Sequence, residues 1–356
     1  MKYTLDTCVW EITVGCNYRC RHCGSACTTP HQDELTTQEA FMAADQIAAL
    51  KPRYVSLTGG EPLLRSDWHM IVERMTRQGV VVCMITNGAL IDEATARQME
   101  SSGLALVSIS MDGTRQIHNH MRGIDCYDRS LQAYRLLADT EVATGANTTL
   151  VKENLFCLEE LRLELMAHGV DKWQIQLGLP VGTLKKNSAS VLEPEALERV
   201  IDFVYESNVK GGIEIYLAES AGYYSRKEAI SRQIASRQEK ISVFKGCNAG
   251  IRSVGILQNG DVVGCTSIRD PGFIEGNIRE RTLAEIWEDE NSFAWRRQMN
   301  VDMLQGFCRD CRYGEICLGG CTNSKLTMTG SMYGENRYCV YHLACSRAGE
   351  LEAEVL

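Results

Sequence analysis

Three closely spaced cysteines near the start of the chain could hold a reactive metal cluster. Cys16, Cys20 and Cys23 follow the spacing C-x3-C-x2-C. Three thiolates can bind three irons of a [4Fe–4S] cube and leave the fourth iron without a protein ligand. A small molecule could bind and react at that open iron. The sequence therefore predicts a reactive iron–sulfur site on the segment that carries these three cysteines.

The total cysteine content supports this interpretation. The chain has 16 cysteines in 356 residues, and its first residues lack the apolar stretch of a signal peptide. A secreted disulfide scaffold would be shorter and would need an export signal. In a reducing compartment, clustered cysteines are more often metal ligands. No run approaches the ~20 apolar residues of a membrane span, so we expect a cytoplasmic protein with no membrane partner.

Charge and composition argue against a nucleic-acid-binding protein. Lys and Arg total 37 against 46 Asp and Glu, so the net charge is −9. No Lys/Arg-rich run is present, which argues against nucleic acid as a partner. The chain is 44% hydrophobic and 23% charged, which is ordinary usage for a globular protein.

The first half of the chain alternates strand-like and helix-like segments. We expect strands at residues 9–14, 54–58, 80–86, 104–111, 146–151 and 172–177, with helices between them. Thr36 and Glu39 form a capping-box pattern at the first helix. Six such units predict an α/β fold, a partial (β/α)6 TIM-like barrel with a parallel sheet. Functional loops then lie at the carboxyl ends of the strands, where the cysteine segment is found.

The pattern changes in the second half. We expect the barrel core at residues 1–180, a connecting region at 181–246, a cysteine- and glycine-rich domain at 247–346 and a tail at 347–356. Few long periodic elements follow residue 247. We therefore expect that domain to be held by its metals rather than by a large core.

The cysteine spacing resembles the signature of the radical S-adenosylmethionine (SAM) enzymes. In that family the open iron binds the amino and carboxylate groups of SAM. An electron from the cluster then splits SAM into methionine and a 5′-deoxyadenosyl radical. The resemblance implies SAM as cofactor and an external reductant of the flavodoxin or ferredoxin type.

Further motifs resemble the SAM-binding residues of that family. The run Gly59-Gly60-Glu61-Pro62 resembles the motif that accepts hydrogen bonds from the SAM amino group, although such a run can also be a plain turn. The resemblance implies contacts from His22 to the adenine, from Ser110 and Asp112 to the ribose and methionine, from Arg122 to the carboxylate, and from Asn87. The alternatives are a surface position for His22 and turn or cap roles for Ser110, Asn87 and Arg122.

A second cysteine array lies near the C-terminus. It comprises seven cysteines at fixed spacings: Cys247, Cys265, Cys308, Cys311, Cys317, Cys321 and Cys339. A zinc ribbon could use Cys308 and Cys311 with another pair, but it would not explain the other positions. The array resembles the signature of the SPASM domain, which implies two auxiliary iron–sulfur clusters.

The resemblance also implies how the ligands divide. Cys247, Cys265 and Cys321 would hold one auxiliary cluster, with Cys345 as a candidate fourth ligand. The second cluster would have the ligands Cys308, Cys311, Cys317 and Cys339. Four thiolates complete a cube, so this second cluster can only carry electrons.

Two cysteines outside both arrays lie near the expected strand-end loops. A thiol at Cys126 or Cys157 could donate a hydrogen atom to a substrate radical, as in radical epimerases of this family. The alternative for each is a plain buried cysteine.

The substrate class follows from the resemblance alone. SPASM enzymes mostly act on peptides or proteins, so we expect oxidative modification or crosslinking of a ribosomally synthesised peptide. Maturation of a sulfatase residue to formylglycine is an alternative. Sulfatase-maturing relatives carry an aspartate directly after the cysteine that here is Cys265, whereas this chain has Thr266, which argues against that alternative.

The first strand begins within about ten residues of the start, which leaves no room for a peptide-recognition domain before it. A separate recognition protein, direct binding of the peptide, or a small substrate are the alternatives. Dehydrogenation or epimerisation of a sugar or alcohol therefore stays open, as does a non-enzymatic electron-transfer protein.

Overall fold

The computed structural model describes residues 3–237, 239–240 and 243–348, and the expected tail lies outside them from residue 349 onward. The chain forms two compact units. The first unit contains residues 1–110, 122–145 and 248–298, and the second contains residues 111–121, 146–247 and 299–356. Each unit therefore combines segments that are far apart in the sequence.

The first unit is built on a mostly parallel sheet. Its strand order is β10 (Ile274–Asn277), β9 (Asp261–Val263), β8 (Ser253–Ile256), β1 (Thr7–Thr13), β2 (Tyr54–Gly59), β3 (Val82–Thr86) and β4 (Leu106–Ser110). Strands β8, β1, β2, β3 and β4 pair in parallel, whereas β9 pairs antiparallel with β8 and β10. Val55, Leu57, Val82 and Met84 are fully buried and alternate with partly exposed residues, so they form one buried face of the sheet.

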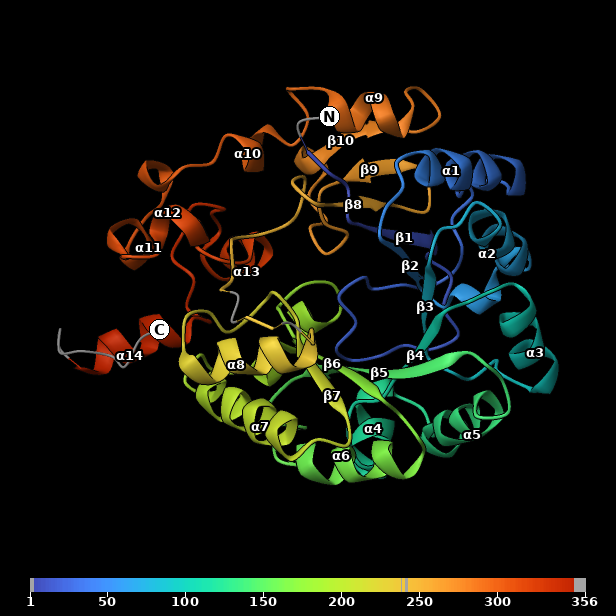
Figure 1. Cartoon of the computed structure of the whole chain (residues 1–356), viewed down its shortest axis with the longest axis horizontal. Coiled ribbons are helices and arrows are strands. Elements are labelled where there is room, and N and C mark those ends of the chain that lie inside the picture. The colour runs from blue at the N-terminus through green and yellow to red at the C-terminus, as the bar shows by residue number, and fades with distance from the viewer. Residues whose placement is uncertain (1–2, 238, 241–242, 349–356) are drawn as a thin grey trace. The chain divides into compact units, whose positions relative to one another are not determined.

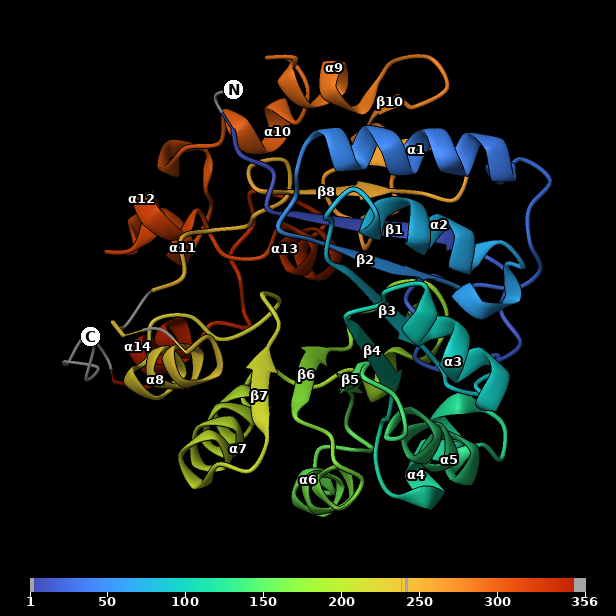
Figure 2. The same ribbon diagram turned by 45° about the vertical axis from the view of Figure 1, so that its right-hand side comes forward.

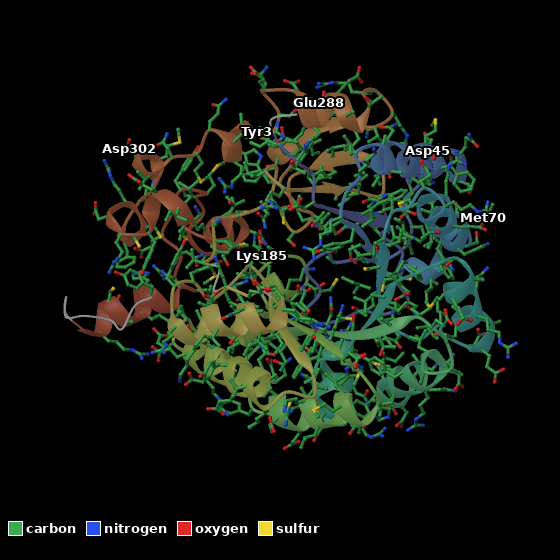
Figure 3. The ribbon with its side chains drawn as sticks, viewed as in Figure 1. Tyr3, Asp45, Met70, Lys185, Glu288 and Asp302 are labelled. Carbon is green, nitrogen blue, oxygen red and sulfur yellow. The ribbon has the colours of Figure 1, made fainter. Side chains whose placement is uncertain are left out.

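Helices follow one another along the strands of this unit (Figures 1 and 2). They are α1 (Thr37–Ala49), α2 (Trp68–Thr76), α3 (Glu93–Ser101) and α5 (Tyr127–Leu137), with a short 3-10 helix η1 (Pro62–Leu64). The expected capping box of Thr36 and Glu39 is present. Asp45 and Met70 point outward from α1 and α2 (Figure 3), whereas Ile47 and Ile71 are fully buried. Burial of this apolar stripe places α1 and α2 against the sheet.

The second unit contains a further strand–helix series. Its elements before residue 247 are most of α4 (Arg115–Arg122) and β5 (Ala143–Leu150), then α6 (Leu158–Ala167), β6 (Lys172–Leu177), η2 (Leu184–Ser190), α7 (Ala196–Lys210), β7 (Glu214–Leu217) and α8 (Arg226–Ala235). Strand β7 pairs in parallel with β6. This strand lies in the expected connecting region and is too short to show in the sequence pattern. Helix α4 was not among the expected elements.

The cysteine-rich region is divided between the two units. Residues 248–298, with strands β8 to β10, η3 (Pro271–Phe273), α9 (Leu283–Glu288) and α10 (Ala294–Arg297), belong to the first unit. Val254, Ile256, Ile286 and Trp287 are at most 1% exposed. An apolar core therefore holds this stretch, which corrects the expectation that metals alone would do so. β8 pairs with β1, so the core is shared with the first strand.

The remaining C-terminal elements belong to the second unit. They are η4 (Val301–Met303), α11 (Phe307–Asp310), α12 (Gly314–Cys317), α13 (Thr322–Thr329) and α14 (Val340–Ala348). Most are a single turn long, and Cys308, Cys317 and Cys339 are themselves part of small buried clusters. Across the described ranges, no helix has the length and apolar character needed to cross a membrane.

Candidate active site

The first cysteine group lies on a loop that is closed at both ends. This cysteine loop, residues 15–28, follows β1. Gly15 and Thr28 form a β-bridge, and the Cys16 N–H donates to the Thr28 carbonyl at 2.8 Å. Cys16, Cys20 and Cys23 are each half-buried. The loop therefore presents its three thiols together on a base that is fixed to the end of β1.

The thiols are chemically available. All 16 cysteines lie in the described residues, and none forms a disulfide. Among the described residues, no three His, Cys, Asp or Glu side chains are close enough to hold a single metal ion. Thiolates around a four-iron cube stand further apart than ligands of one ion, so free thiols on one closed loop fit a cluster better than a mononuclear site.

Cys27 adds a fourth thiol beside the triad. Its thiol donates a hydrogen bond to Cys23, which lowers the pKa of Cys23. Burial acts in the opposite direction on Cys16 and raises its pKa to about 11. Cys27 is 8% exposed, so this residue lies on the buried side of the loop. The sequence left it unassigned because spacing does not show which side of a loop a thiol occupies.

The glycines at 59 and 60 are required by the close approach of the cysteine loop. The Gly60 N–H donates to the backbone carbonyl of Thr13, and the Glu61 N–H donates to that of Gly15, both at 2.7 Å. A Cβ at Gly59 would lie 2.1 Å from the Thr13 carbonyl oxygen, and one at Gly60 would lie 2.0 Å from that of Gly15. The two motifs are thus packed backbone to backbone, with no space for side chains between them. A plain surface turn would not need this.

Glu61 is fully buried and heavily hydrogen-bonded. Its carboxylate accepts from the Thr86 hydroxyl at 2.6 Å, the Asn87 N–H at 2.8 Å and the Leu63 N–H at 3.2 Å. Burial raises the pKa of this carboxyl, and the three donors oppose that shift. A carboxylate offers about four acceptor positions. The three donors therefore hold the carboxylate in a fixed position inside the protein, and Pro62 begins the helix η1 directly after it.

Asn87 connects the end of β3 to the cysteine loop. Its side-chain Nδ2 donates to Oδ1 of Asn17 at 2.7 Å, and its side-chain Oδ1 accepts from the Ala89 N–H at 2.9 Å. These contacts brace the turn after β3 against the cysteine loop, and the SAM contact of Asn87 stays a prediction. Asn17, which lies between two of the cluster cysteines, was not singled out from the sequence.

Arg122 brings a buried positive charge to the same place. Its Nη1 donates to the Sγ of Cys20 at 3.8 Å, and its side chain is 8% exposed. It is also close enough to Glu61 for the two charges to interact. A guanidinium beside the open side of the triad suits the recognition of a carboxylate. His22 is buried as well, at 8% exposed, so the surface alternative for it is wrong.

Cys126 also lies at this loop. Its thiol is paired with the hydroxyl of Tyr18, and burial together with the Cys126 charge raises the Tyr18 pKa. Tyr18 stands between Cys16 and Cys20 in the loop, and both Tyr18 and Cys126 are buried. Cys126 is therefore a neighbour of the predicted cluster site and not a distant core cysteine.

Asp112 is held in a separate polar group in the second unit. Its backbone N–H donates to Nδ1 of His118 at 3.2 Å, its carboxylate accepts from the Thr149 N–H at 3.1 Å, and its carbonyl accepts from the Asn154 amide at 2.8 Å. Asp112 is fully buried. Ser110, at the end of β4, is half-buried and belongs to the first unit.

Cys157 packs against this polar group. Its thiol donates to the Asn154 carbonyl at 3.4 Å, and a Cβ at Gly113 would lie 3.0 Å from its Sγ. Burial raises the Cys157 pKa. A thiol engaged in this way has a structural contact, which is what the plain buried alternative predicts.

Four C-terminal cysteines form a second group in the second unit. Burial raises the pKa of Cys308, Cys311, Cys317 and Cys339, and the thiols of this group are close enough to raise one another's pKa further. Backbone N–H groups also point at their sulfurs, as from Asn336 to Cys308 at 3.3 Å. Four clustered thiols with N–H donors, three of them buried and one half-buried, fit a fully ligated iron–sulfur cube.

Cys345 lies beside this group. Its thiol interacts with the Tyr341 hydroxyl, and its charge acts on Cys311. The sequence offered it instead as a ligand of the other auxiliary cluster. Cys247 and Cys321 belong to the second unit and Cys265 to the first, so their ligand set stays a prediction from spacing.

Two further charged residues were missed in the sequence. Arg269 pairs with Glu11 on β1 in the first unit, and Lys325 on α13 is fully buried in the second. Nothing in the local pattern distinguishes these residues from surface charges. Glu11 is a charged residue inside an apolar strand, and this pattern could have indicated a buried ion pair.

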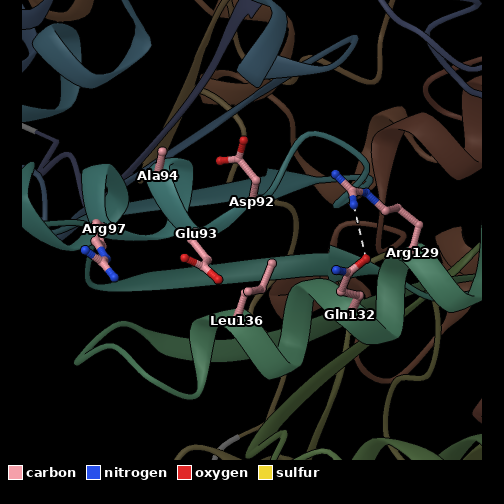
Figure 4. A pocket seen from close by; sticks show the side chains of 7 residues that line it. All are labelled: Asp92, Glu93, Ala94, Arg97, Arg129, Gln132 and Leu136. Carbon is pink, nitrogen blue, oxygen red and sulfur yellow. Dashed lines mark hydrogen bonds between the residues drawn. The ribbon is translucent and has the colours of Figure 1, made fainter.

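An open cavity of about 700 Å³ lies between α3 and α5 in the first unit (Figure 4). Its lining consists of Asp92, Glu93, Ala94, Arg97, Arg129, Gln132 and Leu136. Asp92 caps α3, and Arg129 donates to Gln132 at 3.1 Å. None of the predicted site residues lines this cavity.

Family comparisons agree with these arrangements. Residues 10–165 match the radical SAM superfamily, and residues 247–312 match the SPASM iron–sulfur cluster-binding domain. The AdoMet-dependent heme synthase of Oleidesulfovibrio alaskensis is 29% identical over 343 residues, covering 93% of this chain and 86% of that protein. The mycofactocin maturase MftC of Mycobacterium tuberculosis is 24% identical over 339 residues, covering 93% and 82%.

Solved structures show the same fold. SuiB of Streptococcus suis bound to S-adenosylmethionine has a TM-score of 0.75 at 17% identity, covering 94% of this chain and 77% of that one. AnSMEcpe with bound AdoMet and a Cp18Cys peptide has a TM-score of 0.71 at 19% identity, covering 94% and 93%. The expected α/β fold with a mostly parallel, unclosed barrel-like sheet is confirmed. The chain therefore contains a radical SAM domain and a SPASM domain, and it is an enzyme of the radical SAM type that uses SAM and iron–sulfur cofactors.

Proposed function

We propose that this enzyme reductively cleaves SAM at the cysteine loop and removes a hydrogen atom from its substrate in an oxidative reaction. The observation that supports this most is the convergence of Arg122 and Glu61 on the loop that carries Cys16, Cys20 and Cys23. When bound, the cluster and SAM together supply the electron and the carbon-centred radical for this step.

The protein's own residues have distinct tasks in this proposal. The three thiolates hold the cluster and leave one iron open. Arg122 would pair with the SAM carboxylate, and the run from Gly59 to Pro62 would accept hydrogen bonds from the SAM amino group. His22 and Ser110 would add further contacts to SAM, and the backbones of Gly59 and Gly60 would keep this part of the site fixed.

The C-terminal cysteines would hold the clusters that accept the electron given up by the substrate. Cys308, Cys311, Cys317 and Cys339 would hold a closed cluster that only transfers electrons. Cys247, Cys265 and Cys321 would hold the other auxiliary cluster. A small electron carrier of the flavodoxin or ferredoxin type would reduce the first cluster, which fits a cytoplasmic location.

For the substrate, we propose a tetrapyrrole as the first candidate. Three heme synthases are 28–29% identical to this chain over 93–95% of its length. The pre-heme d1 synthase of Dinoroseobacter shibae is 24% identical. Because these matches run through both domains, they support a shared type of reaction as well as a shared fold.

A peptide is the second candidate, as the sequence led us to expect. MftC is a maturase by name, and SuiB has been solved with its precursor peptide SuiA. A thioether or carbon–carbon crosslink would then be the product, and a separate recognition protein could deliver the peptide. Dehydrogenation or epimerisation of a sugar or alcohol is the third alternative, carried over from the sequence.

One assay separates these possibilities. Anaerobically reconstituted enzyme under strong reductant should convert SAM into 5′-deoxyadenosine, and the correct substrate should accelerate this. Fe-coproporphyrin III and short precursor peptides are the two probes, with substrate loss followed by mass spectrometry. Absence of 5′-deoxyadenosine from a fully iron-loaded sample would contradict the enzyme proposal. Acceleration by the peptide alone would overturn the tetrapyrrole candidate.

The two remaining thiols can be tested in the same assay. If Cys126 or Cys157 donates a hydrogen atom, then Cys126→Ala or Cys157→Ala should leave SAM cleavage intact and change the product or its stereochemistry. Unchanged product from a variant would assign that cysteine to packing.

A further inference from the structure

Arg269 makes an unusual set of contacts within the first unit. It follows Cys265 by four residues, in the segment between β9 and β10. Its Nη1 donates to Oε2 of Glu11 at 2.7 Å, and its Nη2 donates to Oε1 of the same carboxylate. Nη2 also donates to the Ser25 hydroxyl at 2.5 Å. One guanidinium thus joins the first strand, the cysteine loop and the segment that follows a predicted auxiliary ligand.

These contacts are largely shielded from water. The Glu11 side chain is 4% exposed and that of Arg269 is 30% exposed. A buried carboxylate is costly unless it is paired and hydrogen-bonded. The forked contact satisfies both oxygens of Glu11, and it also fixes the plane of the guanidinium. Exposed ion pairs contribute less to stability, because water screens their charges.

The pair lies directly beside the cluster ligands. Ser25 is two residues from both Cys23 and Cys27, and the Arg269 charge acts on both thiols. A positive charge near an iron–sulfur cluster favours the reduced form, which carries one more negative charge. The buried Glu11 carboxylate acts in the opposite direction.

We propose that Arg269 is a positioning residue for the N-terminal cluster, which anchors the cysteine loop to β1 through Glu11 and Ser25 and raises the reduction potential of that cluster. The proposal rests on the radical SAM function proposed above. It couples the chain segment after Cys265 to the loop where SAM binds, although more than 240 residues separate them. It does not require Arg269 to touch SAM or substrate.

The test compares three variants of the cluster-loaded enzyme with a matched control. Arg269→Gln should release iron from the N-terminal cluster to a chelator about tenfold faster, as for loss of other outer-shell partners. At a fixed potential it should also lower the ratio of reduced to oxidised cluster by about tenfold, which corresponds to about 59 mV for a one-electron couple. The EPR signal that changes when SAM is added identifies this cluster.

The test is specific because Arg269→Gln and Glu11→Gln should shift the reduction potential in opposite directions. Glu11→Gln removes the negative partner and should raise the potential, although iron release also becomes faster. Arg269→Lys keeps the charge but loses the fork, so the potential should stay near the wild-type value while iron release accelerates. Arg252→Gln is the control, because Arg252 pairs with Asp6 near the start of β1 and its side chain is 60% exposed.

The outcomes decide the proposal in either direction. If Arg269→Gln matches Arg252→Gln in iron release and potential, the proposal is overturned. If Arg269→Gln does not fold, Arg269→Lys decides: wild-type iron release would overturn the anchoring role. Both readouts are independent of turnover. Wild-type enzyme that yields no 5′-deoxyadenosine would remove the proposed function, whereas the effects on iron release would still be measurable.

Discussion

The cysteine loop after β1 and the four-cysteine group near the C-terminus present thiols in opposite surroundings. In the loop, Cys16, Cys20 and Cys23 are half-buried and stand beside Arg122, Glu61 and Arg269. In the C-terminal group, Cys308, Cys317 and Cys339 are at most 9% exposed, and short helices enclose them.

The difference in burial and in neighbouring charged residues matches the two proposed roles, a reactive SAM site and an electron carrier. A cluster that must bind SAM needs an open iron, access for a ligand and charged groups to orient it. A cluster that only transfers electrons needs a closed, rigid shell, because reorganisation and side reactions are then kept small. The contrast lies in burial and partners, and the spacing of the cysteines shows only part of it.

The largest expected effect comes from removing either thiol set. Cys16, Cys20 and Cys23 changed together to alanine should abolish 5′-deoxyadenosine formation while auxiliary iron remains. Cys308, Cys311 and Cys317 changed together should leave SAM cleavage but lose iron and substrate product. Iron per chain and 5′-deoxyadenosine by chromatography check this. If the second triple variant alone stopped SAM cleavage, the division of roles would be wrong.

The next effect tests the packed floor of the loop. Gly60→Ala places a Cβ 2.0 Å from the Gly15 carbonyl oxygen, so backbone must move. We expect a cost of about 1–3 kcal/mol in the free energy of unfolding and about tenfold slower SAM cleavage. Thermal unfolding and 5′-deoxyadenosine rates measure both.

The control for this variant is Gly272→Ala. Its nearest atom is the Asp270 Oδ1 at 3.2 Å, which belongs to a side chain that can move. Equal effects at the two positions would mean that the close approach at Gly60 is not what makes it glycine.

A smaller effect is expected at Lys325 in the C-terminal group. Its Nζ donates to the Leu318 carbonyl at 2.9 Å, and its charge lowers the pKa of Cys308 against the upward effect of burial. Lys325→Met leaves that carbonyl without this donor, at a cost of about 1–3 kcal/mol in the free energy of unfolding. It should also make the four-thiolate cluster harder to reduce, as a potentiometric titration would show. Lys227→Met, at an exposed pair with Asp202, should change neither.

The smallest expected effect is at Cys345. Because four other thiols already complete the neighbouring group, Cys345→Ala should keep full iron content and change the free energy of unfolding by no more than about 0.5 kcal/mol. Cys311→Ala, in contrast, should lose iron. Iron loss from Cys345→Ala equal to that from Cys311→Ala would make Cys345 a ligand and would blur the contrast between the regions.

Much of the site could be predicted because strand ends and short loops are local features. The alternating pattern placed the cysteine loop, Gly59 and Gly60, and Asn87 at strand ends, where the structure has them. Short elements were missed: β7 has four residues, and the pattern of α4 is too polar to stand out. Helix or strand periodicity needs more residues than these segments provide.

The sequence by itself determined the cofactors, because the cysteine spacings are local motifs that carry the resemblance to the radical SAM and SPASM signatures. Tertiary structure alone decided what surrounds the ligands: the Glu11 and Arg269 pair, the burial of Lys325, and the placement of Cys345 beside Cys311. Those contacts join residues that are distant in the chain. They depend on which segments share a core, as when β8 pairs with β1, and no local pattern of residues carries that information.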